Sequence, residues 1–330
     1  MKWLMAMIGI LGVVWLCGIF LEAPPVARVI DNDVGMSVPQ PGTSVWRFTE
    51  GNSNTRFKEH GLNAALPDGR ANIYLHGDSY IEGLMLSDEK KPDVVLTKAL
   101  GGTNLVWGIG RSGIGIPSFI VHAREYERVF GVPRVHVFFV TSSDDILGDQ
   151  GDEYVWDREG VSKCAPRTSP SKMKLIRFVN KYHLNFLISC YNNFNRLKKR
   201  RWHLVPGISR GDTSKQSSDE SAPVAQCFEA LCGEIKRTVK APVLFVYCPH
   251  TPVLANGSVT CSAGEECFLK VKGVDIVDVS PALNSLYAAQ GVFPRGFDNA
   301  SGPGDGHLNA LGVEAVFSYV AKYMKEKYGL

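Results

Sequence analysis

The clearest indication of the fold is the sequence Ile73-Tyr74-Leu75-His76-Gly77-Asp78-Ser79-Tyr80, in which a short apolar run ends in small and polar residues. Uninterrupted apolar runs of this kind are typical of strands that are covered on both faces in a parallel sheet. Similar runs follow at 105–107, 135–140, 243–247 and 274–277. Stretches with helical spacing separate them or close the chain, at 88–100, 118–130, 224–239 and 310–328. This alternation predicts an α/β fold, a three-layer α/β/α sandwich around a mainly parallel five-stranded sheet.

The beginning of the chain predicts one N-terminal transmembrane helix. Residues 3–21 are 19 residues without a charge, close to the ~20 that span the hydrocarbon core of a bilayer. A signal peptide is the competing interpretation, but its apolar region is usually ~7–15 residues long and is followed by a small-residue cleavage site, which is missing here. Lys2 precedes the span and Glu22 follows it, which places the rest of the chain on the extracytoplasmic side.

Composition divides the chain into three regions. Residues 1–22 form the anchor, or an uncleaved signal, and residues 23–70 are rich in Pro, Gly, Asn and Ser, which predicts a stalk that merges into the domain edge. Residues 71–330 form the α/β domain, interrupted at about 149–222 by a helical and disordered insertion. A net charge of +3 over 330 residues gives no reason to expect a nucleic-acid partner.

Polar residues gather where the predicted strands end. Ligands of open parallel sheets bind at the carboxyl ends of the strands, so these residues are the candidates for a site. The stretches concerned are His76–Tyr80, Gly108–Gly115, Thr141–Asp145, Cys248–His250 and, just before the last helix, Gly304–Gly312. All of them are expected at one edge of the sheet.

The residues at this edge include the groups that a catalytic serine needs. A serine hydroxyl needs a base to take its proton and donors for the oxyanion that forms. Ser79 lies on a strand-to-helix turn, where its own backbone N–H is available, and Gly110 in the glycine-rich turn after the second strand presents another. His307 is the candidate base, and Asp305 the candidate acceptor that fixes the tautomer of His307.

Taken together, Gly77-Asp78-Ser79, Gly110 and Asp305-x-His307 resemble three of the four sequence blocks of the SGNH (GDSL-like) hydrolase family. The resemblance covers roughly residues 71–145 and 240–328. It implies that Ser79 is the acyl acceptor, that His307 is the base, and that a glycine N–H and a block-three asparagine stabilise the oxyanion.

Two residues depart from that pattern. Many family members place the acid three residues before the histidine, where this chain has Gly304. Asp305 stands only two residues before His307, so its carboxylate would have to approach the ring from a different position. The block-three asparagine is expected near Ser143 and Asp144, and no asparagine stands there. An ionised Asp144 cannot donate to an oxyanion, so the candidate replacements are the hydroxyl of Ser142 or Ser143, or an Asp144 held protonated by burial.

The resemblance implies a carboxylic ester hydrolase that acts through a Ser79 acyl-enzyme. We expect it to remove an O-acyl group, acetyl in the first place, from a small molecule or from a cell-envelope or extracellular glycan or lipid. His250 is a candidate substrate contact, and no metal or organic cofactor is expected. Two alternatives remain open. An O-acyltransferase of a polysaccharide acetylation system would share the acyl-enzyme and would need a membrane-protein partner to deliver the donor. A non-catalytic scaffold subunit of a membrane assembly would keep the fold with a degraded site.

Overall fold

The computed structural model describes residues 28–47, 50–63, 65–66, 68–142, 145–146, 154–157, 160–163, 221–249, 269–297 and 303–330, with Met5, Gly9, Gly12 and Val13. Almost all of them belong to one compact unit, made of Pro25–Ala165 and Gln216–Leu330. Among these residues no helix has the length and apolar character that a membrane span requires. The predicted span at 3–21 and the helical part of the insertion lie almost entirely outside the described residues.

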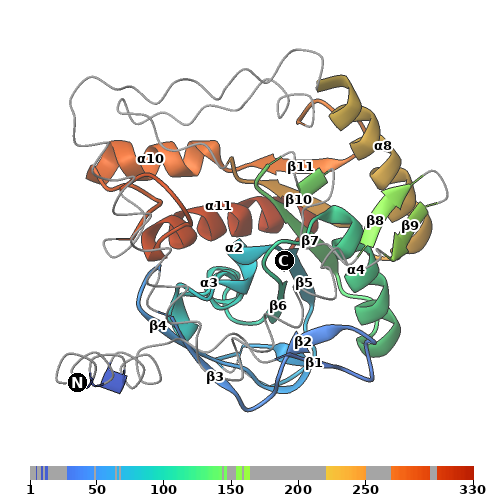
Figure 1. Cartoon of the computed structure of the whole chain (residues 1–330). Helices are drawn as coiled ribbons and strands as arrows, with labels where there is room; N and C mark the ends of the chain where they lie inside the picture. Colours follow the sequence, from blue (N-terminus) through green and yellow to red (C-terminus); the bar gives the residue numbers. More distant parts are fainter. Residues whose placement is uncertain are drawn as a thin grey trace. The chain divides into compact units, whose positions relative to one another are not determined.

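Five parallel strands form the central sheet, as the sequence predicts (Figure 1). The strands are β5 (Ile73–Gly77), β6 (Val106–Gly110), β7 (Val135–Val140), β10 (Val243–Tyr247) and β11 (Asp275–Asp278). Their order is β11-β10-β7-β5-β6, with every neighbouring pair parallel. The central strand β7 is buried along its whole length, which explains why its sequence is an uninterrupted apolar run.

Helices cover both faces of this sheet and complete the three layers (Figure 1). One apolar cluster joins the sheet to α3 (Pro92–Ala99), α10 (Ser280–Gln290) and α11 (Ala310–Tyr328). A second cluster joins the other face to α4 (Ile116–Phe130) and α8 (Ser221–Thr238). The predicted three-layer α/β/α sandwich is therefore confirmed.

Two helices differ from the sequence prediction. The helix expected at 88–100 is split into a 3-10 turn, Asp88–Lys90, and α3, because Lys91 adopts the extended conformation favoured before Pro92. Helix α10 was not predicted. Its buried face holds Ser280 and Ala282 beside two leucines, so its apolar periodicity is weak.

Residues 28–66 are not a stalk. They form two antiparallel hairpins, β1 (Arg28–Ile30) with β2 (Ser37–Pro39) and β3 (Ser44–Arg47) with β4 (Ser53–Arg56), followed by a 3-10 turn at Glu59–Gly61. Met36 and Leu62 pack in one cluster with Trp107 of β6 and Tyr126 of α4. Because these strands are only three or four residues long and none has more than two adjacent apolar residues, they left little apolar signal in the sequence. A further hairpin, β8 (Tyr154–Asp157) with β9 (Gly160–Lys163), lies within the predicted insertion.

Candidate active site

The candidate nucleophile stands on a sharp turn between β5 and the short helix α2 (Ser79–Glu82). Asp78 caps this helix, because its carboxylate accepts from the backbone N–H of Tyr80 at 2.9 Å. Gly77 allows the chain to fold back on itself, since a Cβ there would lie 2.2 Å from Cγ1 of Ile81. The turn therefore presents Ser79 at the carboxyl end of the strand.

His307 reaches this serine from the loop before α11. Its Nε2 lies 2.8 Å from the Ser79 hydroxyl, across 228 positions of sequence. The loop turns at Gly304 and Gly306, both with positive φ, and ends where the Asn309 side chain accepts from Gly312 N and caps α11. The structure thus brings together the two residues that the sequence singled out as nucleophile and base.

The acid beside this histidine is Glu50, not Asp305. The ring Nδ1 of His307 donates to Glu50 Oε2 at 2.7 Å, and the backbone N–H of His307 donates to Glu50 Oε1 at 3.0 Å. Asp305 is exposed, and its carboxylate accepts from the N–H of Gly306 at 2.8 Å. The prediction that Asp305 orients His307 is therefore wrong. The positive φ of Gly306 turns the chain between the two residues, so the Asp305 carboxylate accepts from the Gly306 N–H and not from the ring of His307.

Glu50 comes from the N-terminal hairpins, which dock beside α2. Gly51 has a φ of 73°, and a Cβ there would lie 2.2 Å from the carbonyl oxygen of Met85 in the loop that follows α2. Only glycine allows the hairpin to come this close to that loop. The Ser53 hydroxyl donates to the carbonyl of Leu84. The one sequence signal was an acid followed by glycine in a polar stretch, which is too common to single out a catalytic residue.

The three side chains form a single line of hydrogen bonds, Ser79 to His307 to Glu50. A carboxylate only accepts, so Nδ1 of His307 carries the proton and Nε2 is free to accept from the Ser79 hydroxyl. A longer contact of 3.5 Å joins the same hydroxyl to Asp78, but the histidine is the closer partner. The Glu50 side chain is 16% exposed and that of His307 22%, so the pair is shielded while the histidine keeps access to solvent. This is the arrangement that a serine nucleophile with a general base requires.

Gly110 lies against α2. A Cβ at this position would be 2.1 Å from the backbone N of Glu82 and 2.5 Å from the carbonyl carbon of Ile81. This close approach of β6 to α2 explains the glycine by packing. Donation to an oxyanion by the N–H groups of Gly110 and Ser79 stays a prediction.

We expect Gly110→Ala to destabilise the fold, because backbone atoms of α2 cannot yield to the new methyl group. Overpacking of this kind costs about 1–3 kcal/mol of unfolding free energy, occasionally more. Urea unfolding would measure it. Gly233→Ala is the matched control, because a Cβ at Gly233 in α8 meets nothing within 4 Å. Equal stability of Gly110→Ala and wild type would contradict the close approach.

Ser143, Asp144 and His250, predicted to take part in the oxyanion site and in substrate contact, lie outside the described residues. Their neighbour Asp145 is described and buried. Its Oδ2 accepts from the N–H and the hydroxyl of Thr141, at 2.6 and 2.9 Å, and from the N–H of Ser142 at 3.1 Å. Asp145 therefore fixes the backbone at the carboxyl end of β7, where the third sequence block begins.

Asp145 makes the stability of the fold depend on pH. Burial, with the nearby charge of Asp78, raises the pKa of Asp145 from 3.8 to about 8. A carboxyl group with a raised pKa in the folded state favours folding while it stays protonated, so stability falls as pH rises between these values. We expect Asp145→Asn, which stays neutral, to lose less unfolding free energy than wild type between pH 5 and pH 8. An equal loss in urea titrations of both proteins would contradict the raised pKa.

Only one group of acidic and histidine side chains among the described residues has the spacing of a cation site, namely Asp31, Asp33 and His60. His60 Nδ1 already pairs with Asp31 Oδ2 at 2.7 Å. The group shares no residue with the Ser79–His307–Glu50 line.

No protein-family model and no curated protein matches the chain. Solved structures similar to it include a carbohydrate acetylesterase family member from Sinorhizobium meliloti, with 13% identity and a TM-score of 0.38, covering 78% of this chain and 100% of the other. Another is a member of the lipolytic protein G-D-S-L family from Veillonella parvula, with 12% identity and a TM-score of 0.40, covering 77% of this chain and 98% of the other. Likeness at this level does not assign an activity, which has to follow from the geometry of the site.

Proposed function

We propose that the chain is a serine ester hydrolase of the SGNH type that removes an O-acyl group from its substrate through an acyl-enzyme on Ser79. The hydrogen-bonded line from Ser79 through His307 to Glu50 carries this proposal. It supplies a nucleophile, a base in the correct tautomer, and a carboxylate that stabilises the imidazolium formed during the reaction.

The reaction has two halves. The Ser79 oxygen attacks the ester carbonyl carbon while His307 Nε2 takes the hydroxyl proton, which gives a tetrahedral oxyanion. The oxyanion collapses, the alcohol leaves with the proton from His307, and the acyl group stays on Ser79. Water then attacks the acyl-enzyme with His307 as base, and the carboxylic acid is released while Ser79 recovers its proton.

The finer part of the proposal concerns the substrate. We propose an acetyl or other short acyl group on a cell-envelope or extracellular glycan or lipid. Residues 3–21 would anchor the chain in a membrane with the α/β domain on the extracytoplasmic side, where such substrates occur. The uncharged length of that segment and the charges on either side of it support this placement.

A serine-directed fluorophosphonate tests the nucleophile, and a panel of p-nitrophenyl esters of increasing acyl length tests the reaction. We expect the full chain, solubilised in mild detergent, to be labelled on Ser79 and to hydrolyse the acetyl ester fastest. Ser318→Ala on the exposed face of α11 is the matched control and should be labelled like wild type. If wild type and Ser79→Ala are equally unlabelled and equally inert over the panel, the proposal is wrong.

The alternatives predict different outcomes in the same experiments. An O-acyltransferase would be labelled on Ser79 but would release little free acid, and would form acylated oligosaccharide when a sugar acceptor is added. A scaffold subunit would show neither labelling nor turnover. The intact Ser79–His307–Glu50 line argues against the scaffold, because a site without catalytic use has no need to keep three aligned partners.

A further inference from the structure

A buried guanidinium that takes no part in the reaction above lies behind the candidate site. Arg295 is 1% exposed and comes from the segment between α10 and α11. Its Nη1 donates to the Tyr80 hydroxyl and, at 3.0 Å, to the carbonyl of Gly306. Its Nη2 donates to the carbonyl of Pro249 at 2.5 Å and to Cys248 Sγ at 3.3 Å. One side chain thus joins three segments that meet at the carboxyl edge of the sheet.

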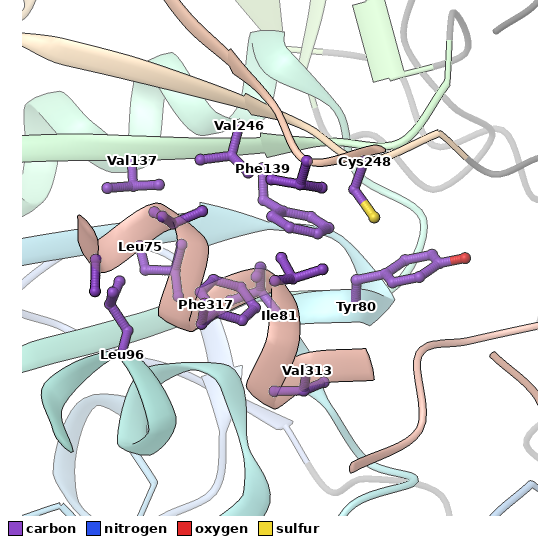
Figure 2. Packing of buried hydrophobic residues seen from close by; sticks show 14 of the residues in the cluster. Leu75, Tyr80, Ile81, Leu96, Val137, Phe139, Val246, Cys248, Val313 and Phe317 are labelled. Atoms are coloured by element: carbon purple, nitrogen blue, oxygen red, sulfur yellow. The ribbon is translucent and has the colours of Figure 1, made fainter. Parts of the chain in front are cut away.

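Two of these partners flank the candidate catalytic pair. Tyr80 directly follows Ser79, and Gly306 directly precedes His307. The Tyr80 hydroxyl also donates to the Gly306 carbonyl at 3.2 Å, and the ring centroids of Tyr80 and His307 lie 4.8 Å apart. Burial raises the pKa of Tyr80 above the usual phenol range, so the hydroxyl stays a donor. In Figure 2 the Tyr80 ring lies at the end of the apolar cluster near Cys248, with its hydroxyl pointing out of the cluster.

The backbone around Arg295 holds the same loop. Gly296 N–H donates to the carbonyl of His307 at 3.0 Å, and Gly304 N–H donates to the carbonyl of Arg295 at 3.0 Å. Asn309 N–H donates to the carbonyl of Pro294, also at 3.0 Å. The loop that carries His307 is therefore attached to the Arg295 segment on both sides of the histidine, through main chain as well as side chain.

A buried arginine is not the simplest way to stabilise this part of the fold. Removing a cation from water is costly unless it is paired with an anion, and an apolar side chain of similar volume often serves stability as well or better. Among the described residues its four hydrogen-bond partners are neutral, since burial also raises the pKa of Cys248, to about 11, and the charge of Asp78 acts on the guanidinium only through space. Its Nε finds no hydrogen-bond partner among the residues described. What a planar guanidinium adds is a fork of fixed geometry that holds several acceptors at once.

We infer that Arg295 is a positioning residue: it ties Tyr80 and Gly306 to the end of β10 and thereby sets the distance between the Ser79 hydroxyl and His307 Nε2. The inference rests on the proposed function and adds to it a residue that touches neither reacting group. It acts through Tyr80, which orients the nucleophile turn, and through Gly306, which orients the base.

The first test compares Arg295→Lys, Arg295→Met and Tyr80→Phe in the full chain. Misplacement of reacting groups by about 1 Å can cost on the order of 100-fold in rate, so we expect kcat on p-nitrophenyl acetate to fall roughly 10- to 100-fold in both Arg295 variants. KM should stay within about threefold, because the substrate is not contacted. Lysine keeps the charge but not the fork, so it should rescue Tm more than kcat. Tyr80→Phe keeps the contact between Arg295 and Gly306, so its kcat should fall less than that of the Arg295 variants.

Val320→Ala is the matched stability control. Val320 lies in α11, is fully buried and packs in the apolar cluster that also contains Tyr80. Its truncation should lower Tm, while kcat measured well below Tm should stay at the wild-type value. If Arg295→Met and Val320→Ala lower Tm alike and neither changes kcat by more than about twofold, Arg295 is merely structural and the inference is wrong.

The second readout needs no turnover. The ring Nδ1–H of His307, held by Glu50, should give a protected downfield proton resonance in the NMR spectrum, assigned by its absence in His307→Gln. We expect Arg295→Met to shift or broaden this resonance and Val320→Ala to preserve it. Should wild type prove unlabelled and inert, the proposed function fails while this measurement still decides the positioning. An unchanged resonance in Arg295→Met would overturn the inference that Arg295 positions His307.

Discussion

Replacing Glu50 by glutamine is expected to lower kcat on a short acyl ester by about 10³–10⁴-fold while the protein stays folded. One carboxylate oxygen of Glu50 accepts from the backbone N–H of His307, and the other accepts from its ring Nδ1–H. A glutamine has one acceptor oxygen and one NH₂ group, so one of these two contacts would join donor to donor.

The imidazole can resolve this conflict by moving its proton to Nε2. That tautomer accepts from the amide but no longer accepts from Ser79, so the base is lost while the fold is kept. The imidazolium would also lose its neighbouring negative charge. Steady-state kinetics would show the loss in kcat, and circular dichroism would show that the variant is folded.

Asp305→Asn is the control for this prediction, because it makes the same carboxylate-to-amide change at an exposed residue two positions before the histidine. We expect its kcat to stay within about twofold of wild type. The reverse outcome, a large loss in Asp305→Asn and little in Glu50→Gln, would restore Asp305 as the acid and would contradict the contacts seen around His307.

The sheet could be predicted from sequence because its strands are buried on both faces. The predicted ranges 135–140 and 243–247 coincide with β7 and β10, since nothing polar interrupts those runs except His136. That histidine is paired within the core, with His76 at 2.9 Å and with Glu127 at 3.1 Å. A strand that is buried on both faces has an uninterrupted apolar sequence, which can be recognised without knowing its neighbours in the sheet.

Ser79 and His307 were predictable for a related reason. Each follows or precedes an element that the sequence defines well, and the topology of a parallel sheet brings the carboxyl ends of its strands to one edge. Glu50 had no such context, because it belongs to a polar hairpin whose place depends on contacts with Met85 and Leu84. Only tertiary structure puts that carboxylate against the ring, which is why a nearer acid, Asp305, was the natural choice from sequence.

The largest loss of activity is expected from Ser79→Ala and His307→Ala. Each should lower kcat by about 10⁶-fold, or about 8 kcal/mol of transition-state stabilisation at 1.36 kcal/mol per factor of ten. A nucleophile without its base, or a base without its nucleophile, cannot form the acyl-enzyme. The double variant should therefore be no slower than either single variant, because the two residues act as one unit.

This non-additivity separates the proposed mechanism from a looser one. If a water molecule attacked the ester directly, with His307 as its base, Ser79→Ala would keep much of the activity and His307→Ala would remove it. Fluorophosphonate labelling would then be absent from wild type as well. Equal losses in both single variants and in the double variant, together with labelling of wild type only, are what an acyl-enzyme requires, because without Ser79 there is no acyl-enzyme for the histidine to help form or hydrolyse.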